Sequence, residues 1–274
     1  MYFLKKLTSS INRSLVQILL YFNHFISARK TISKQVLLNF FKKIEPIETG
    51  RPLTRFGNNF DGGYLIPNDL SNLTKCFTIG VGNDISFEDD LSKKGISSYF
   101  ADGTVDCLPM QSKYFTFIKK NISITNSDKY ITINDFIKNG QKNSSEDFIL
   151  KIDIEGAEYR NIQNLEENLL IQARILVVEF HYMQRMLSGL YFSNVIEPTF
   201  AKILKTHSVV HIHPNNDSGF YIYNKKKIFK TLEITFLRND RIIKKQKKLQ
   251  YTSQLDRPTN PKKKELIIPE NYFN

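Results

Sequence analysis

Three carboxylates follow a run of apolar residues in the middle of the chain, at Asp153, Glu155 and Glu158. The predicted strand, residues 148–154, has the composition of a buried strand and contains the first of these carboxylates near its end. An unpaired charge inside such a strand costs several kcal/mol or shifts its pKa. A site explains these carboxylates better, because ligands of open α/β sheets bind beyond the carboxyl ends of the strands. The pattern therefore predicts a binding or catalytic site at the end of this strand.

Two later strands carry groups that could work with these carboxylates. One predicted strand ends at Glu179 and His181, and another contains His211 and His213. Each pair is spaced i, i+2, which places both side chains on the same side of a strand. If the strands adjoin, carboxylates and imidazoles converge on one point.

Such a cluster allows two ways to activate a hydroxyl group, and the residue pattern leaves both open. His181, with an ordinary pKa of ~6.5, suits a general base. Alternatively, Asp153 and His181 with His211 or His213 hold a divalent metal that lowers the pKa of a bound hydroxyl. Mixed nitrogen and oxygen ligands favour Mn, Fe, Co or Zn over Ca. The predicted catalytic residues are Asp153, His181 and His211.

A glycine-containing turn earlier in the chain predicts a nucleoside site. Gly80 and Gly82 follow a predicted strand at residues 76–79 and precede a predicted helix, and glycine there allows a tight turn and a close approach to a ligand. Asp102 lies 20 residues after Gly82, at the end of the next predicted strand. A carboxylate in that place accepts hydrogen bonds from the hydroxyls of a ribose.

The ligand of this turn is predicted to be S-adenosylmethionine and not a dinucleotide. A dinucleotide site needs a third glycine where this chain has Ile85. Asp84 and Glu88 would repel a pyrophosphate, whereas S-adenosylmethionine has no phosphate and carries a sulfonium and an ammonium. The predicted cofactor-binding residues are Gly80, Gly82, Asp84, Ser86, Asp102, Asp153 and Glu155.

With these motifs, the chain resembles the FkbM family of S-adenosylmethionine-dependent methyltransferases. The resemblance rests on residues 151–158, Lys-Ile-Asp-Ile-Glu-Gly-Ala-Glu, with the Gly80-Val-Gly82 turn upstream, and it extends over roughly residues 55–240. It implies a Rossmann-like methyltransferase fold with a seven-stranded sheet, and O-methylation of sugars or natural-product hydroxyls. The chain departs from the pattern at Thr78, where many methyltransferases have an acid, and at Asp84, where many have glycine.

Two further segments, residues 61–64 and 211–216, are similar to a branch of this family that occurs in bacterial glycan clusters. That similarity implies a sugar acceptor, nucleotide-linked or glycan-bound, in capsule or lipopolysaccharide biosynthesis, with heptoses among the sugars. Tyr64, Asn215 and Asn216 are the substrate residues expected on this basis. A plain turn explains the two asparagines nearly as well.

The elements that position these groups alternate along the chain. Predicted strands at residues 76–79, 97–101, 115–118, 148–154, 175–180 and 209–213 are separated by helices, and residues 219–223 and 232–237 are expected to form a closing antiparallel pair. This order predicts an α/β fold with a doubly wound, mostly parallel sheet and helices on both faces. Residues 1–48 are predicted to be a helical extension, and residues 49–274 the methyltransferase domain with a basic C-terminal segment.

The net charge and its distribution along the chain limit the partners that this protein is expected to bind. The chain of 274 residues has a net charge of +12, of which residues 225–264 carry +11, so the rest is nearly neutral. A Lys-rich solvated surface is the preferred interpretation of this segment, although it could meet phosphates of a substrate. Residues 244–264 are expected to be a surface tail or partly disordered. No nucleic-acid partner is expected, because no aromatic platform or groove-reading helix is evident.

Two cysteines, Cys76 and Cys107, without metal or disulfide spacing favour a reducing compartment, and no convincing signal peptide precedes the domain. A cytoplasmic enzyme without a transmembrane segment is therefore expected. Residues 15–26 have the pattern of an amphipathic helix that lies on a partner subunit or a membrane surface, which suggests a homo-oligomer or peripheral membrane contact. The alternative functions are a nicotinamide-dependent oxidoreductase and a non-catalytic binder of anionic surfaces.

Overall fold

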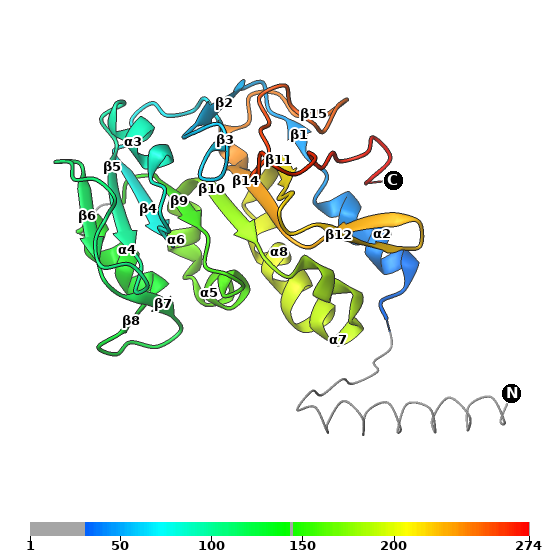
Figure 1. Ribbon diagram of the computed structural model, residues 1–274, viewed down its shortest axis with the longest axis horizontal. Coiled ribbons are helices and arrows are strands. Elements are labelled where there is room, and N and C mark those ends of the chain that lie inside the picture. Colours follow the sequence, from blue (N-terminus) through cyan, green and yellow to red (C-terminus); the bar gives the residue numbers. More distant parts are fainter. Residues whose placement is uncertain (1–30, 143–144, 274) are drawn as a thin grey trace, which may run out of the picture.

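The computed structural model describes residues 31–142 and 145–273. Its centre is a seven-stranded sheet in the order β11-β14-β10-β9-β4-β5-β6 (Figure 1). Every neighbouring pair is parallel except the two pairs made by β14. The prediction of a mostly parallel α/β sheet is therefore confirmed. The strands are β4 (Lys75–Ile79), β5 (Ser97–Ala101), β6 (Phe115–Ile118), β9 (Phe148–Ile152), β10 (Ala173–Phe180), β11 (His207–Pro214) and β14 (Leu232–Arg238).

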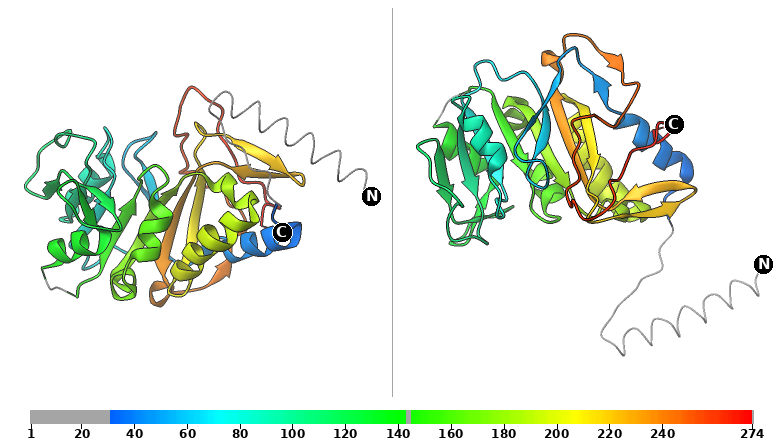
Figure 2. Two further views of the ribbon diagram at one scale, coloured as in Figure 1. Left: turned by 90° about the horizontal axis from the view of Figure 1, so that it is seen from below. Right: turned by 45° about the horizontal axis from the view of Figure 1, so that its top comes forward.

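Helices cover one face of the sheet and a mixed layer covers the other. Alternate residues of the central strands point to opposite faces: Leu150 of β9 joins the core under the helices, whereas Ile149 joins the second core. A layer of helices lies beside the sheet (Figure 2), and all contribute buried residues to the first core. These helices are α2 (Lys34–Lys43), α4 (Ile133–Gln141), α5 (Glu158–Asn164), α6 (Glu167–Gln172) and α8 (Glu197–Leu204).

The second face is covered by helix α3 (Ser86–Ser92) and by the hairpin of β2 (Leu53–Phe56) and β3 (Tyr64–Pro67). Helices therefore lie on both faces, as the alternation of elements predicted. Shorter elements complete the chain, namely β1 (Ile47–Glu48), β7 (Asn121–Ser123), β8 (Tyr130–Thr132), η1 (Met183–Leu187), α7 (Gly189–Tyr191), η2 (Phe192–Ile196), β12 (Phe220–Tyr223), β13 (Lys226–Phe229), η3 (Asn239–Arg241) and β15 (Gln246–Lys247).

Helix α2 is the described part of the predicted N-terminal extension. Ser33 caps it by accepting a hydrogen bond from the Val36 backbone N–H. The ring of Phe40 lies edge-on to that of Phe200 in α8, with centroids 5.1 Å apart, so α2 packs into the same core as the sheet. The amphipathic pattern at residues 15–26 lies outside the described residues. Among the residues with described structure, none of the helices is long and apolar enough to cross a bilayer.

The predicted closing pair of residues 219–223 and 232–237 is wrong. Strand β12 instead pairs with β13 in a separate hairpin, and β14 enters the central sheet between β10 and β11. The turn at Asn224 and Lys225, both with positive φ, closes the β12–β13 hairpin locally. Local propensity predicted both strands but not their partners. Strand β14 fills a position between β10 and β11, and this position exists only in the assembled sheet.

Candidate active site

The carboxyl ends of four parallel strands meet at one edge of the sheet. Ile79 of β4 is in register with Ile152 of β9 and with Ala101 of β5. The residues that follow these strands, Gly80, Asp102 and Asp153, are therefore neighbours. The Asp153 backbone N–H donates to the Ile79 carbonyl at 2.8 Å, which holds the loops together.

The turn after β4 needs its glycines. Gly80 has a φ of +83°, and a Cβ added there would lie 1.7 Å from the Asp153 carbonyl oxygen, so any larger residue would displace the β9 loop. Gly82 has a φ of +57°, and no atom lies within 4 Å of the place of a Cβ. The turn therefore packs against the loop after β9 at Gly80 and faces open space at Gly82.

Asp102 fixes this turn. Its carboxylate accepts hydrogen bonds from the backbone N–H groups of Val81, at 2.8 Å, and Thr104, at 2.7 Å. Burial alone would raise the pKa of Asp102, but the hydrogen bonds from Thr104 and Val81 outweigh it and lower the pKa. Asp102 is therefore an ionised acceptor whose position is set by the backbone.

A cleft of about 670 Å³ opens in front of this turn. It contains most of the predicted cofactor residues, and Tyr64, predicted for the substrate, also borders it. Ser86 does not line the cleft; its hydroxyl donates to Asp84, so it supports the loop from behind. The acids that line the cleft are Asp61, Asp84, Asp102, Asp153 and Glu155.

Glu88 does not belong to the acidic face of the turn, contrary to the sequence prediction. Its side chain is fully buried, and its Oε1 accepts from the Thr78 hydroxyl at 2.7 Å and from Lys151 Nζ at 3.1 Å. Burial alone would lower the pKa of Lys151, but the charge of Glu88 raises it. The acid beside Thr78 is therefore Glu88, which lies on the inner face of helix α3.

Replacing Lys151 with methionine should destabilise the protein by about 3–5 kcal/mol, because Glu88 would remain as a buried charge without its partner. Urea unfolding of both proteins measures this difference in the free energy of unfolding. Lys93→Met is the matched control, because Lys93 pairs with Asp89 and Asp90 at the surface and should contribute little. Equal unfolding midpoints for wild type and Lys151→Met would contradict the importance of this ion pair.

A second cavity, of about 440 Å³, adjoins the first, and Asp61, Asp153 and Glu155 border both. His181 and Glu179 line only the second cavity. The two cavities therefore share these three carboxylates, with the glycine turn lining the first cavity and the imidazole lining the second.

Glu158 orients His181, a function that the sequence did not reveal. The Glu158 side chain is fully buried, and its Oε1 lies 2.9 Å from His181 Nδ1 and accepts from the Gly156 backbone N–H at 2.9 Å. With this acceptor at Nδ1, the proton of the neutral ring belongs on Nδ1. The backbone is held as well, because Tyr159 donates its hydroxyl to the His181 carbonyl at 2.7 Å.

The other ring nitrogen faces the second cavity. His181 Nε2 lies 3.4 Å from a Glu155 oxygen and 3.9 Å from oxygens of both Asp153 and Glu179. Glu155 and Tyr182, which flank this group, have positive φ values of +53° and +56°, a backbone conformation that other residues than glycine adopt at a cost. Strain of this kind clusters at functional sites.

Electrostatics in this cavity favour an added positive charge. Burial raises the pKa of Asp153 to about 6. Burial and the charge of Asp153 also raise the pKa of Glu179. Burial alone would lower the pKa of His181, but the hydrogen bond to Glu158 and the surrounding carboxylates raise it. The ionised forms of Asp153 and Glu179 are therefore disfavoured unless a positive charge lies beside them.

Asp153, Glu179 and His181 each offer one ligand atom, and the three atoms lie within 4.8 Å of one another. One imidazole and two carboxylates suit Mn, Fe, Co or Zn. A carboxylate at the far nitrogen of the imidazole, here Glu158, is the usual support of a metal-binding histidine. The residues present therefore fit a divalent cation, with Glu179 in the place that the sequence assigned to a further histidine.

His211 and His213 do not join this group, because β14 separates their strand β11 from β10. The side chains do share a side of β11, with parallel rings 6.5 Å apart, as the i, i+2 spacing predicted. His211 Nε2 lies 2.9 Å from Asp256, and His213 lies between Glu233 and Glu265, at 3.3 and 3.1 Å. Their partners come from β14 and from the C-terminal segment, not from β9.

His213 should make stability depend on pH. Burial alone would lower its pKa, but the charges of Glu233 and Glu265 raise it to about 10, above the ~6.5 of an unfolded chain. The stabilisation is therefore complete below pH ~6.5 and is lost as pH rises through about 10. Between pH 7 and 10, wild type should lose about 2–4 kcal/mol more unfolding free energy than His213→Gln. Parallel pH profiles of urea unfolding would contradict this.

The predicted substrate residues Asn215 and Asn216 have separate roles. Asn215 lines the second cavity and donates from Nδ2 to Glu179 at 2.8 Å. Asn216 turns away and holds the C-terminal segment, where its Oδ1 accepts from the Asn260 backbone N–H at 2.7 Å. Thr259, Asn260 and Pro261 line the second cavity from that segment, which the sequence treated as a surface tail.

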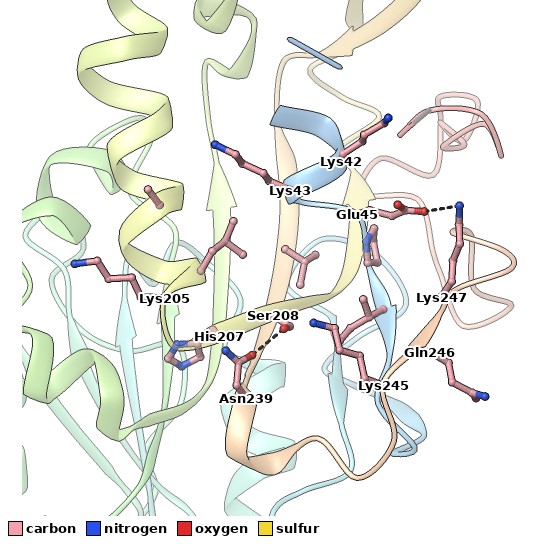
Figure 3. Close-up of a pocket in the computed structure, with 15 residues that line it drawn as sticks. Lys42, Lys43, Glu45, Lys205, His207, Ser208, Asn239, Lys245, Gln246 and Lys247 are labelled. Carbon is pink, nitrogen blue, oxygen red and sulfur yellow. Dashed lines mark hydrogen bonds and ion pairs between the residues drawn. The ribbon is translucent and has the colours of Figure 1, made fainter. Parts of the chain in front are cut away.

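A third cavity, of about 750 Å³, lies at the opposite end of the sheet, beside the first residues of β11 (Figure 3). His207, which borders it, is engaged by Thr206 and by the Ala173 carbonyl, so its ring nitrogens are satisfied. This cavity is larger than the two described above, but its carboxylate, Glu45, pairs with Lys247 at 3.2 Å. Its cations are Lys42, Lys43, Lys205, Lys245 and Lys247.

Comparison with known proteins identifies a family for this chain. The sequence profile of the methyltransferase FkbM domain matches residues 62–207, more than half of the chain. No curated protein sequence matches the chain. Among solved structures, a TehB-like SAM-dependent methyltransferase from Corynebacterium glutamicum is similar, with 12% sequence identity and a TM-score of 0.32, and the match covers 61% of this chain and 80% of that one.

Proposed function

This chain belongs to the FkbM methyltransferase family, and from that premise we propose that it transfers a methyl group from S-adenosylmethionine to a hydroxyl group of a sugar. The observation that supports this proposal most is the pair of adjoining cavities that share Asp61, Asp153 and Glu155. One cavity has the features of a nucleoside site and the other those of a site that activates an alcohol.

The first cavity fits S-adenosylmethionine. Asp102, ionised and fixed by the backbone, would accept the ribose hydroxyls, and the open side of Gly82 leaves room for the nucleoside. The acids Asp84 and Glu155 suit a sulfonium and an ammonium and disfavour phosphates. When bound, S-adenosylmethionine supplies the methyl group: the acceptor oxygen forms the new C–O bond, the C–S bond breaks with its electron pair left on sulfur, and the hydroxyl proton goes to a base.

The second cavity would hold the acceptor alcohol. We propose that Asp153, Glu179 and His181 bind a divalent cation, which would supply Lewis acidity toward the hydroxyl. Glu158 keeps the His181 ring in position, and the carboxylates of Asp61 and Glu155 border the cavity as acceptors for the released proton. If no metal is used, His181 itself would be the base.

A nucleotide-linked or glycan-bound sugar in bacterial surface polysaccharide biosynthesis is the acceptor class that we propose. Amide and carboxylate groups such as Asn215 and Glu179 line the second cavity and suit hydrogen bonds with several hydroxyls. Lys262 and Lys264 follow the cavity wall in sequence and could meet phosphates of a nucleotide carrier. Because S-adenosylmethionine and nucleotide-sugars are cytoplasmic metabolites, this function places the enzyme in the cytoplasm.

The test is transfer of a radiolabelled methyl group from S-adenosylmethionine to a panel of nucleotide-sugars that includes GDP-mannose, UDP-glucose and dTDP-glucose. Label in the sugar, and not in the nucleoside, supports the proposal. The metal is tested by exhaustive chelation followed by return of Mn²⁺: turnover should fall at least tenfold and recover. Undiminished turnover after chelation would remove the metal and leave His181 as base.

A nicotinamide-dependent oxidoreductase and a non-catalytic binder of anionic surfaces are the competing functions. Thermal unfolding distinguishes them, because a ligand that binds the native state raises the melting temperature. S-adenosylhomocysteine should raise it, whereas NAD and RNA should not. Stabilisation by NAD alone would overturn the proposal.

A further inference from the structure

The segment from residue 248 to residue 273 contains no helix or strand, yet it is firmly attached to the sheet. Tyr251, Tyr272 and Phe273 are buried in the main core, and the Tyr272 ring packs on Phe41 of α2 with centroids 4.8 Å apart. The orange-to-red chain in Figure 1 follows this route from β15 to the neighbourhood of α2. Long ordered loops of this kind in a compact domain are usually functional.

Between its anchors the segment is held over the second cavity by polar contacts. The Asn216 side chain makes a two-way bond with Asn260: Oδ1 accepts from the backbone N–H at 2.7 Å, and Nδ2 donates to the carbonyl at 2.9 Å. Asp217 accepts from Asn260 Nδ2 and lies 2.7 Å from Lys263 Nζ. Residues 216 and 217 thus bind the segment from the end of β11.

The two histidines of β11 attach the same segment at two further points. His211 lies 2.9 Å from Asp256, which precedes the wall residues, and His213 lies 3.1 Å from Glu265, which follows them. Both histidines are buried, with 3% and 6% of their surface exposed. The segment between these two points is therefore held at both ends and in the middle.

The middle of this segment lines the second cavity. Thr259, Asn260 and Pro261 line the same cavity as Glu179 and His181. These residues contribute a hydroxyl, an amide and a proline ring, without charge. In contrast, Asp153, Glu155 and Glu179 contribute carboxylates to the same cavity. An acceptor in this cavity would contact both groups of residues. The uncharged group around Asn260 would therefore limit the size of the acceptor and the pattern of its hydroxyls.

We propose that residues 256–265 form a fixed wall of the acceptor cavity and determine which sugar the enzyme accepts, with Asn216, His211 and His213 as positioning residues that attach the wall to the sheet. The inference rests on the proposed methyl-transfer function. This wall lies beyond the part of the chain that matches the family profile, so the acceptor specificity of this enzyme belongs to a segment outside that match.

The experiment compares wild type with Asn216→Ala and Asn260→Ala on the sugar of the nucleotide-sugar panel that wild type methylates. Both variants should raise the KM for this sugar at least tenfold, broaden the range of sugars accepted, and change kcat less than threefold. The affinity for S-adenosylhomocysteine, measured by calorimetry, should stay within twofold, because neither residue lines the cofactor cleft. Hydrogen exchange should become faster in residues 256–265 of Asn216→Ala and remain unchanged in β4 and β9.

Gln254→Ala is the matched control, because it removes an exposed amide from the same segment outside the cavity. It should retain the KM and acceptor range of wild type. An unchanged KM and acceptor range in both variants, with wild type active, would overturn this inference alone. A wild-type enzyme that binds S-adenosylhomocysteine but methylates no sugar would overturn the proposed sugar acceptor and the inference with it. A lower affinity for S-adenosylhomocysteine in Asn216→Ala would show general damage, which Asn260→Ala then tests independently.

Discussion

Replacing His181 with alanine should lower the rate of methyl transfer by about 100- to 10,000-fold. The imidazole lines the second cavity and is needed as a metal ligand in one mechanism and as the base in the other, so either mechanism predicts this loss. The affinity for S-adenosylhomocysteine should change little, because His181 does not line the cofactor cleft. Turnover assays and calorimetry measure the two quantities separately. A variant with the wild-type rate would remove His181 from the chemistry.

Glu179→Gln distinguishes the two mechanisms. A metal site would lose a ligand, so Mn²⁺ binding, followed by electron paramagnetic resonance, and turnover should both fall by at least an order of magnitude. A metal-free base would still have the His181 ring and its partner Glu158, so turnover would fall much less. Glu167→Gln is the control, because Glu167 is exposed at the start of α6 and pairs with Lys205 at the surface. Loss of turnover without any Mn²⁺ binding in wild type would contradict the metal proposal.

Replacing Asp102 with asparagine should weaken binding of S-adenosylhomocysteine by about 2–4 kcal/mol, roughly 30- to 1,000-fold. The variant loses charged hydrogen bonds to the ribose. In wild type the carboxylate accepts hydrogen bonds from the backbone N–H groups of Val81 and Thr104. An asparagine amide has one oxygen in place of two, so its NH2 group would face one of these N–H donors. Because Asp102 holds the glycine turn, a modest loss of stability should accompany the loss of affinity.

Calorimetric titration with S-adenosylhomocysteine measures the affinity, and thermal unfolding of the free protein measures the stability. Asp106→Asn is the matched control, since Asp106 is four residues away, exposed, and paired with Lys119. Its affinity should equal that of wild type. Equal affinities for Asp102→Asn and wild type would show that the ribose does not bind at Asp102.

Much of the fold could be predicted from the chain. The strands at residues 97–101 and 115–118 have the predicted bounds, because alternating burial and flanking turn residues mark them locally. The predicted strand at residues 148–154 instead ends at Ile152, since the chain turns at Asp153 and Glu155 takes a positive φ. Glu155 is therefore outside the strand, so the alternation of side chains along a strand does not set its direction.

The candidate site was predicted in part. The convergence of Gly80, Asp102, Asp153 and His181 followed from one rule, that parallel strands end at the same edge of the sheet. The inclusion of His211 failed because that rule needs the order of the strands, and β14 entered between β10 and β11. Strand order is decided by long-range pairing, which local sequence patterns do not encode.

By itself, the sequence determined which strands end in acids, imidazoles and glycines, because side-chain type and the two-residue period of a strand are local properties. Only the tertiary structure decided which of these groups meet: that Glu158 orients His181, that Glu88 is buried with Lys151, and that residues near Asn260 line the second cavity. These are contacts between segments far apart in the chain, and their partners are selected by packing and by the need to satisfy buried polar groups.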